Sequence, residues 1–118
     1  MTPQGCLATA DRLLHGGTAG GWWPRACACL IRLALEHAID DFWRRTSPPV
    51  AACGAMRTRL LMLRRRPGRD VARRATFAWS ALSRATHHHC YDSAPTAGEL
   101  RRLHTEVSEL VIHLTGRE

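Results

Sequence analysis

The sequence predicts an all-α protein, an up-and-down helical bundle of four principal helices plus a short N-terminal helix. Apolar residues recur at three- and four-residue steps along most of the chain, and strand-like alternation bounded by turn residues is absent. Clusters of glycine and proline divide the chain into pieces of helix length, and the short connections favour antiparallel neighbours. At 118 residues, the chain is expected to form a single domain spanning residues 1–118.

Two helices are expected in the N-terminal part of the chain. The first, over about residues 4–15, is short, stops at Gly16-Gly17 and is expected to be peripheral. The second, over about residues 22–45, is the longest, and it ends before the run Ser47-Pro48-Pro49. Its apolar residues cover most of the circumference, which predicts a central position in the bundle. They leave a narrow polar stripe at Arg25, Arg32, Glu36 and Asp40.

Three further helices are expected in the remainder. The third covers about residues 50–65 and is broken by Pro67-Gly68. The fourth begins near Asp70, a good N-cap residue, and the fifth begins where Thr96 and Glu99 have the spacing of a capping box. Apolar residues repeat at helical steps in both: Val71, Ala75, Ala78, Leu82 and Ala85 in the fourth, and Leu100, Leu103, Val107, Leu110 and Leu114 in the fifth.

The charge of the chain comes from arginine alone. There is no lysine, and the 17 basic residues outnumber 10 acidic ones, for a formal net charge of +7. Guanidinium groups bind phosphate in a bidentate fork and stack on bases, so an arginine-only surface suits a nucleic-acid partner. The alternative is the codon bias of a GC-rich genome, which favours arginine over lysine; the absence of asparagine fits that explanation equally well.

Many of these arginines are concentrated around the turn between the third and fourth expected helices. We predict that they form an RNA-binding surface, although a solvated charged face is the ordinary explanation of such a run. A basic helical DNA-binding regulator is a further alternative, but no helix-turn-helix stands out. The candidate RNA-binding residues are Arg57, Arg64, Arg65, Arg66, Arg69 and Arg73, and Arg59 and Arg74 lie in the same window.

Metal sites, disulfides and membrane spans are not indicated. The five cysteines form no C-x2-C pair. The run from His87 to Cys90 cannot converge on one ion while helical, because successive side chains point about 100° apart. We therefore expect no metal and no cofactor. The longest apolar run, residues 26–31, is too short to span a bilayer, and no signal peptide is evident, so the cytoplasm is the default location and no membrane partner is expected.

The strongest candidate for chemistry is an R-x4-H-x-Y pattern formed by Arg84, His89 and Tyr91. An arginine can stabilise charge developing on a phosphate, and imidazole has a pKa suited to proton transfer near neutrality. In an unbroken helix, His89 would point about 140° away from Arg84, so the pattern requires the fourth helix to end close by. Arg32 and His37 form a second R-x4-H copy without the tyrosine.

Arg84, His89 and Tyr91, placed between the long penultimate helix and the final amphipathic helix, resemble the catalytic motif of the HEPN superfamily. Residues 32–38, Arg-Leu-Ala-Leu-Glu-His-Ala, are similar to a Glu-bearing helix common in that superfamily, and the resemblance covers roughly residues 22–115. It implies a metal-independent endoribonuclease, or a toxin-like module that targets RNA. Arg84 would hold the scissile phosphate, and His89 would transfer a proton.

The same resemblance implies partners. HEPN proteins dimerise so that two copies of the motif face one another, which predicts a homodimer with a composite site. Tyr91 matches the tyrosine that a nucleotidyltransferase antitoxin modifies in some HEPN toxins, and His87 and His88 would be secondary or substrate-lining residues. Two alternatives stay open: His89 as a core histidine, and a catalytically inactive HEPN-type module that binds nucleotide, RNA or protein. The sequence also leaves undecided whether His88 or His89 is the working imidazole.

Overall fold

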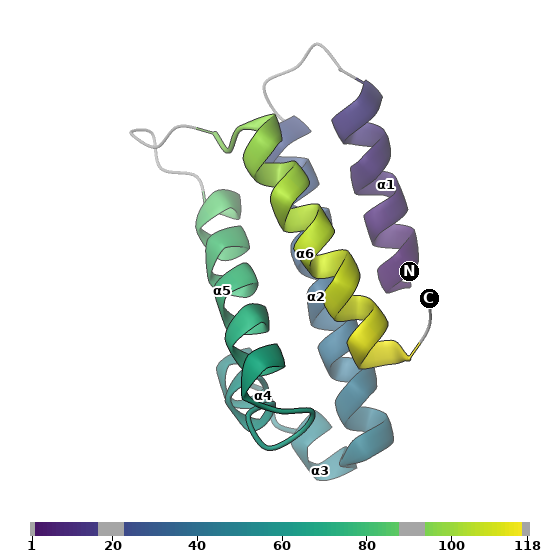
Figure 1. Ribbon diagram of the computed structural model, residues 1–118, viewed down its shortest axis with the longest axis vertical. Helices are drawn as coiled ribbons and strands as arrows, with labels where there is room; N and C mark the ends of the chain where they lie inside the picture. The colour runs from purple at the N-terminus through teal and green to yellow at the C-terminus, as the bar shows by residue number, and fades with distance from the viewer. Residues whose placement is uncertain (1, 17–22, 88–93, 117–118) are drawn as a thin grey trace.

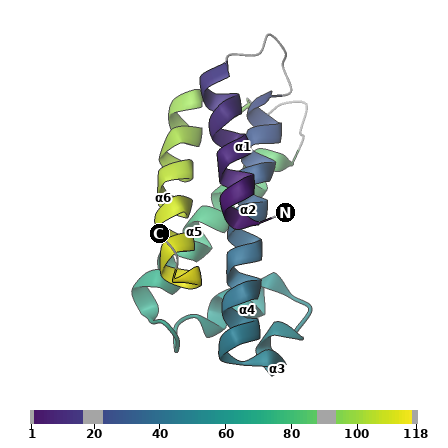
Figure 2. The same ribbon diagram turned by 90° about the vertical axis from the view of Figure 1, so that its right-hand side faces the viewer.

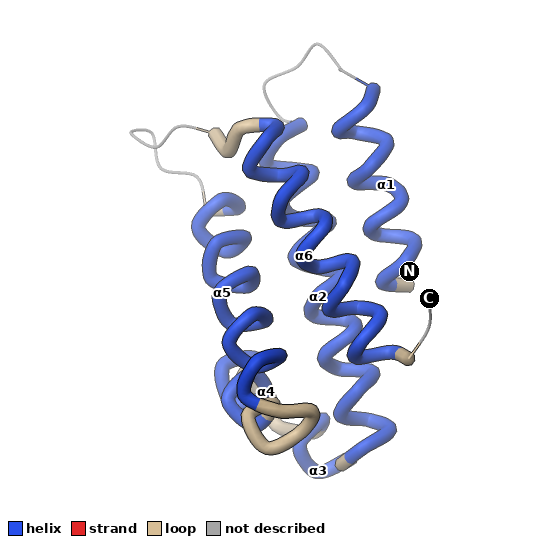
Figure 3. Tube along the Cα trace, in the orientation of Figure 1, coloured by secondary structure: helices blue, strands red, loops and turns tan. Residues whose placement is uncertain are grey.

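The computed structural model describes residues 2–16, 23–87 and 94–116, and in these ranges all regular elements are helices (Figures 1 and 3). The prediction of an all-α protein is confirmed for this part of the chain. The helices are α1 (Pro3–Gly16), α2 (Trp23–Thr46), α3 (Pro48–Ala51), α4 (Met56–Met62), α5 (Arg69–Thr86) and α6 (Ala97–Thr115).

Helix α2 occupies the central position that its apolar circumference predicts. It packs against α1, α5 and α6 along its length and against α3 and α4 near its C-terminal end (Figures 1 and 2). Cys27, Ile31, Leu35 and Ile39 of α2 are completely buried. Trp43 is also buried, and its indole Nε1 donates a hydrogen bond to the carbonyl of Arg59, 3.1 Å away. This contact holds the start of the α4 region against the end of α2.

Helix α1 is part of the core, so the expectation that it is peripheral is wrong. Cys6, Leu7, Ala10 and Leu14 are buried where α1 lies along α2 and α6 (Figure 2). In addition, His104 of α6 bonds through Nε2 to the carbonyl oxygen of Leu7 at 2.9 Å. The sequence signal was present in the apolar spacing of this helix, but its short length made burial hard to predict.

The single third helix expected over residues 50–65 is two short helices. Chain direction changes between α3 and α4, with Ala55 in an extended conformation before α4 begins. Gly54 lies in this break, and glycine is a weak helix former because ordering it costs more backbone entropy than ordering alanine. The break allows Leu60 and Leu63 to reach the core, where both are buried.

Helix α5 begins slightly earlier than expected. Its N-cap is Gly68, whose φ of 151° few other residues adopt, and Asp70 instead lies in the first turn. The division of its two faces is as predicted. Val71, Ala75, Ala78 and Leu82 are buried, with Ala85 partly buried, whereas Arg73, Phe77 and Arg84 on the other face are exposed and Ser80 is partly exposed.

Helix α6 confirms the predicted capping box. The Thr96 hydroxyl oxygen accepts a hydrogen bond from the Glu99 backbone N–H at 3.1 Å, and the hydroxyl lies 3.1 Å from the Glu99 carboxylate. The helix ends at Gly116, which has the left-handed conformation typical of a C-terminal cap. Its apolar stripe is buried against α2, α1 and α5. None of the helices among the described residues is long and apolar enough to cross a bilayer.

Candidate functional site

The motif arginine lies on the last turn of α5. Helix α5 ends at Thr86, and His87 has an extended backbone (φ −75°, ψ 128°), so the chain leaves the helix three residues after Arg84. The early helix end that the R-x4-H pattern requires is therefore present, and the 140° separation of an unbroken helix does not apply. His88, His89 and Tyr91 lie outside the described residues. The structure thus places Arg84 and His87, and their position relative to His89 stays a prediction.

Two arginines of α2 hold the end of α5. Arg25 Nη1 donates hydrogen bonds to the carbonyl oxygens of His87 at 3.1 Å and Ala85 at 3.5 Å. Arg32 Nη1 donates to Thr86 Oγ1 at 3.2 Å. The last carbonyls of a helix lack partners within the helix and carry partial negative charge, so a cation placed there satisfies and stabilises them. Arg25 and Arg32 therefore fix the point at which the chain enters the histidine run.

Glu36 anchors Arg32 in this position. One carboxylate oxygen, Oε2, accepts hydrogen bonds from Arg32 Nε at 3.2 Å and from Trp79 Nε1 at 3.0 Å. The guanidinium of Arg32 also lies 5.6 Å from the centroid of the Trp79 ring, a cation–π distance. Glu36, Arg32 and Trp79 thus tie the middle of α2 to α5. The sequence marked Arg32 and Glu36 as part of a polar stripe but did not reveal that these two residues contact α5.

Arg84 borders a hollow of about 740 Å³ between α4 and α5, which we call the arginine groove. Two exposed apolar side chains contribute to its lining: Leu61 of α4 is 58% exposed and Phe77 of α5 is 68% exposed. The charged residues that line the groove are four arginines: Arg64, Arg69, Arg73 and Arg84.

The charges of the groove are largely uncompensated. Arg64, Arg69 and Arg84 are exposed and make no ion pair with a described residue, while Arg73 pairs with Asp70 at 3.2 Å. Four cations therefore converge on a surface with one nearby carboxylate, which also reaches Arg74 at 3.9 Å. Such a surface favours an anionic ligand.

The other predicted RNA-binding residues do not line the groove. Arg57, Arg65 and Arg66 are exposed and likewise make no ion pair with any residue of the described ranges. Two arginines of the same sequence window have structural contacts instead. Arg59 pairs with Asp40 at 3.4 Å, and Arg74 pairs with Glu106 at 2.6 Å and Glu109 at 2.7 Å, which joins α5 to α6. The hydrogen bond to Glu106 is the main cause that raises the pKa of Arg74 above its ordinary value.

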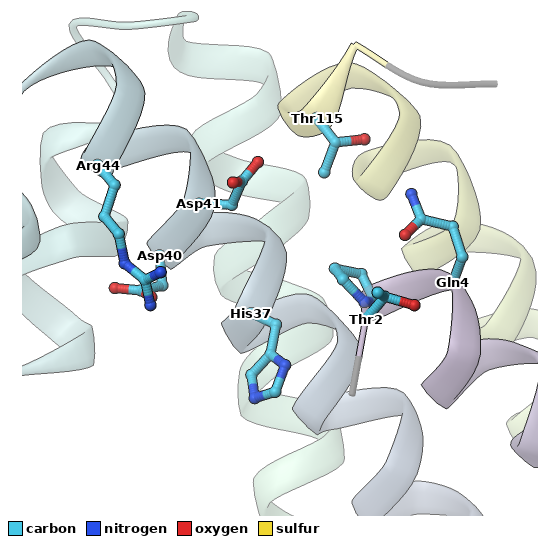
Figure 4. Close-up of a pocket in the computed structure, with 8 residues that line it drawn as sticks. Thr2, Gln4, His37, Asp40, Asp41, Arg44 and Thr115 are labelled. Carbon is cyan, nitrogen blue, oxygen red and sulfur yellow. The ribbon is translucent and has the colours of Figure 1, made fainter.

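The second R-x4-H copy does not form a site. Arg32 faces α5, whereas His37 lines a different hollow, of about 440 Å³, beside the start of α1 and the end of α6 (Figure 4). Two carboxylates in that hollow are paired with arginines one turn further along α2, Asp40 with Arg44 and Asp41 with Arg45. The hollow therefore offers little free charge, and neither Arg84 nor His87 lines it.

Potential metal ligands do not cluster in the described ranges, where no group of three or more His, Cys, Asp or Glu side chains could hold an ion. Of the run from His87 to Cys90, the structure describes His87 alone.

Cys27 is fully buried, and its Sγ lies 3.6 Å from the carbonyl oxygen of Ala10. Burial, assisted by the negative charge of Asp11, raises the pKa of Cys27 from 9.0 to about 11, so this thiol is protonated at neutral pH.

Comparison with protein-family models, with curated proteins and with solved structures finds no match for this chain. The resemblance to the HEPN superfamily therefore depends on the motif residues and on their place in the helix order.

Proposed function

We propose that this chain is a HEPN-like domain that binds RNA in the arginine groove and cleaves it without a metal, using Arg84 and His89. The observation that carries this proposal is the position of Arg84. It is exposed, it lies in a groove with three further arginines, and it precedes by three residues the point where α5 ends and the histidine run begins. We further propose that the helices form an up-and-down bundle of the HEPN type.

The chemistry requires two proton transfers and stabilisation of one developing charge. The 2′-hydroxyl of the RNA attacks the adjacent phosphorus and loses its proton, while the 5′-oxygen leaves and gains one. His89 would serve as one proton-transfer group, and the guanidinium of Arg84 would stabilise the charge on the phosphate oxygens. Neither step needs a cofactor.

A homodimer would complete the site. One chain supplies one Arg84 and one His89, and a second copy would supply the second imidazole for the other proton transfer. Because two arginine grooves repel one another, we expect bound RNA to promote the association of two copies. An antitoxin with nucleotidyltransferase activity that modifies Tyr91 is the partner that the resemblance implies.

Cleavage of a labelled structured RNA in EDTA tests the proposal. Wild type, Arg84→Ala, Arg84→Lys and His89→Ala are compared, each first shown by circular dichroism and light scattering to be folded and to have the wild-type oligomeric state. Arg12→Ala is the matched control. Arg12 is an exposed arginine of α1, and α1 and α5 lie on opposite sides of the molecule (Figure 1).

We expect cleavage by wild type and Arg12→Ala and its loss in Arg84→Ala and His89→Ala. Cleavage that persists in both motif variants would show that the motif is not the active site. Binding without cleavage by wild type would identify a catalytically inactive binding module. Selective binding of duplex DNA over RNA would favour the DNA-binding regulator instead.

A further inference from the structure

Phe77 is the most exposed large apolar side chain in the described ranges, at 68%. It lies at the middle of α5, on the face opposite the buried stripe of Val71, Ala75, Ala78 and Leu82. The core-facing side of α5 is already occupied by these four residues, so Phe77 lies on the solvent-facing side of the helix. We infer that Phe77 is a stacking site for one unpaired nucleobase of RNA bound along α5.

The surroundings of Phe77 leave it accessible from two sides. It lines the arginine groove between α4 and α5, and it also lines a second hollow, of about 620 Å³, between α5 and α6. Arg73 borders both hollows, and Arg74 and Arg102 border the second together with the carboxylates of Glu99 and Glu106. An aromatic side chain that stands between two hollows with cations at their rims can accept a planar base while the arginines contact the backbone phosphates.

The spacing along α5 suits a strand that follows the helix axis. Arg73 precedes Phe77 by four residues and Arg84 follows it by seven, so the two lie about 6 Å and about 10 Å from it along the axis. All three are on one face, because four- and seven-residue steps return to nearly the same side of a helix. The strand would thus have cationic contacts on either side of the stacked base.

Charge decides between RNA and a second copy of this chain as the occupant of the groove. Docking a second copy directly on Phe77 would bring two sets of the same arginines together. Two nearby carboxylates, Asp70 and Glu106, are already paired with Arg73 and Arg74. Only Glu99, which contacts Thr96, borders Phe77 without an arginine partner among the described residues. Burying like charges without counter-charges is strongly unfavourable. An RNA strand instead neutralises the arginines of the groove, and one of its bases can cover the exposed ring of Phe77.

This inference rests on the proposed RNA binding and specifies which RNA is bound. A base within a duplex has both faces covered by its neighbours, so Phe77 would select unpaired nucleotides, in a single strand or a loop. The arginines alone would not make that selection, because they contact phosphates that every RNA carries.

The experiment measures the affinity of the full-length chain by fluorescence anisotropy for three labelled RNAs of equal length. They are an unstructured single strand, the same backbone without bases, and a blunt duplex. The variants are Phe77→Ala and Phe77→Trp, with Ile112→Ala as the matched control. Ile112 is an exposed apolar residue of α6, 44% exposed, and it lines neither hollow beside Phe77.

We expect wild type and Ile112→Ala to bind the single strand about tenfold more tightly than the abasic backbone, as one stacked base would give. Phe77→Ala should remove this difference and leave the abasic affinity unchanged, and Phe77→Trp should retain it. A difference that survives Phe77→Ala would overturn the stacking site while the proposed RNA binding stands.

Two other results overturn the inference in different ways. Wild type that binds none of the three RNAs would overturn the proposed RNA binding itself, and the stacking site with it. A change from dimer to monomer in RNA-free Phe77→Ala, measured by sedimentation, would assign this surface to a subunit interface.

Discussion

Nη1 of Arg25 in α2 lies 3.1 Å from the carbonyl oxygen of His87, to which it donates a hydrogen bond across 62 residues of sequence. The contact connects the first turns of the central helix to the residue at which α5 ends. It is reinforced about two turns further along α2 by the bond from Arg32 to Thr86. The backbone of His87, the last described residue before the motif histidine, is thus held by a residue of another helix.

Replacing Arg25 with alanine should loosen the end of α5. The variant loses the cation that satisfies the carbonyls of Ala85 and His87, so we expect the free energy of unfolding to fall by about 1 kcal/mol. Amide hydrogen exchange should accelerate in the last turn of α5 while the exchange of α6 is unchanged. Arg12→Ala serves as the control. Unaltered exchange at the end of α5 in Arg25→Ala would contradict this role.

The hydrogen bond from Trp79 to Glu36 should couple these two residues energetically. Trp79→Phe removes the indole N–H that bonds to Glu36, and Glu36→Gln removes the carboxylate charge. We expect each change to lower the free energy of unfolding by about 1 kcal/mol. The double variant should lose less than the sum, because both changes weaken the bond from Trp79 to Glu36: the first removes its donor and the second removes the charge of its acceptor. Urea denaturation measures the cycle, and strict additivity would show that the contact contributes nothing.

The salt dependence of RNA binding should separate the groove arginines from an exposed arginine elsewhere on the surface. Each phosphate contact on a single strand contributes about −0.7 to the slope of log affinity against log salt concentration. Arg69→Ala and Arg84→Ala should each reduce the steepness by about that amount, because both arginines lack a carboxylate partner among the described residues. Arg12→Ala should leave the slope unchanged. Equal effects of all three substitutions would indicate attraction by net charge without a defined site.

The buried thiol of Cys27 should make the fold sensitive to alkali. Below pH 9 the thiol is protonated in both the folded and the unfolded chain. Between pH 9 and about 11 only the unfolded chain loses the proton, so the stability contributed by this group falls as the pH rises through that range. Between pH 8 and pH 10.5, the urea concentration at the unfolding midpoint should fall by more for wild type than for Cys27→Ala. Alkylation at pH 8 provides a second check: exposed Cys29 should react before Cys27.

Local features of the sequence were sufficient to predict several elements. The bounds of α2 and α6 follow from proline, glycine and capping residues, which act on the backbone within a few positions of themselves. Thr96 and Glu99 make the predicted capping contacts. The two faces of α5 were predictable because a periodic apolar pattern of this length leaves one way to bury the helix.

Other features depend on contacts that the linear pattern does not show. The break between α3 and α4 follows from the need to bring Leu60 and Leu63 to the core, and Gly54 alone is a weak signal of it. The burial of α1 was not predicted, because whether a short helix is buried depends on which other helices pack over it. Of the candidate site, the sequence predicted the arginines of the groove, and its R-x4-H pattern required an early end of α5. It did not reveal the exposed ring of Phe77 as a neighbour of these arginines.

The sequence by itself determined that the described chain is helical, where most helices begin and end, and that its positive charge gathers around the turn before α5. These properties follow from backbone preferences and periodicity, which are local. Only the tertiary structure decided which arginines remain available to a ligand. Arg74 finds Glu106 32 residues away and becomes a structural contact, while Arg69, five positions earlier, meets no carboxylate in the described ranges and borders the groove. Partner choice depends on which helices pack together, and that is a property of the fold as a whole.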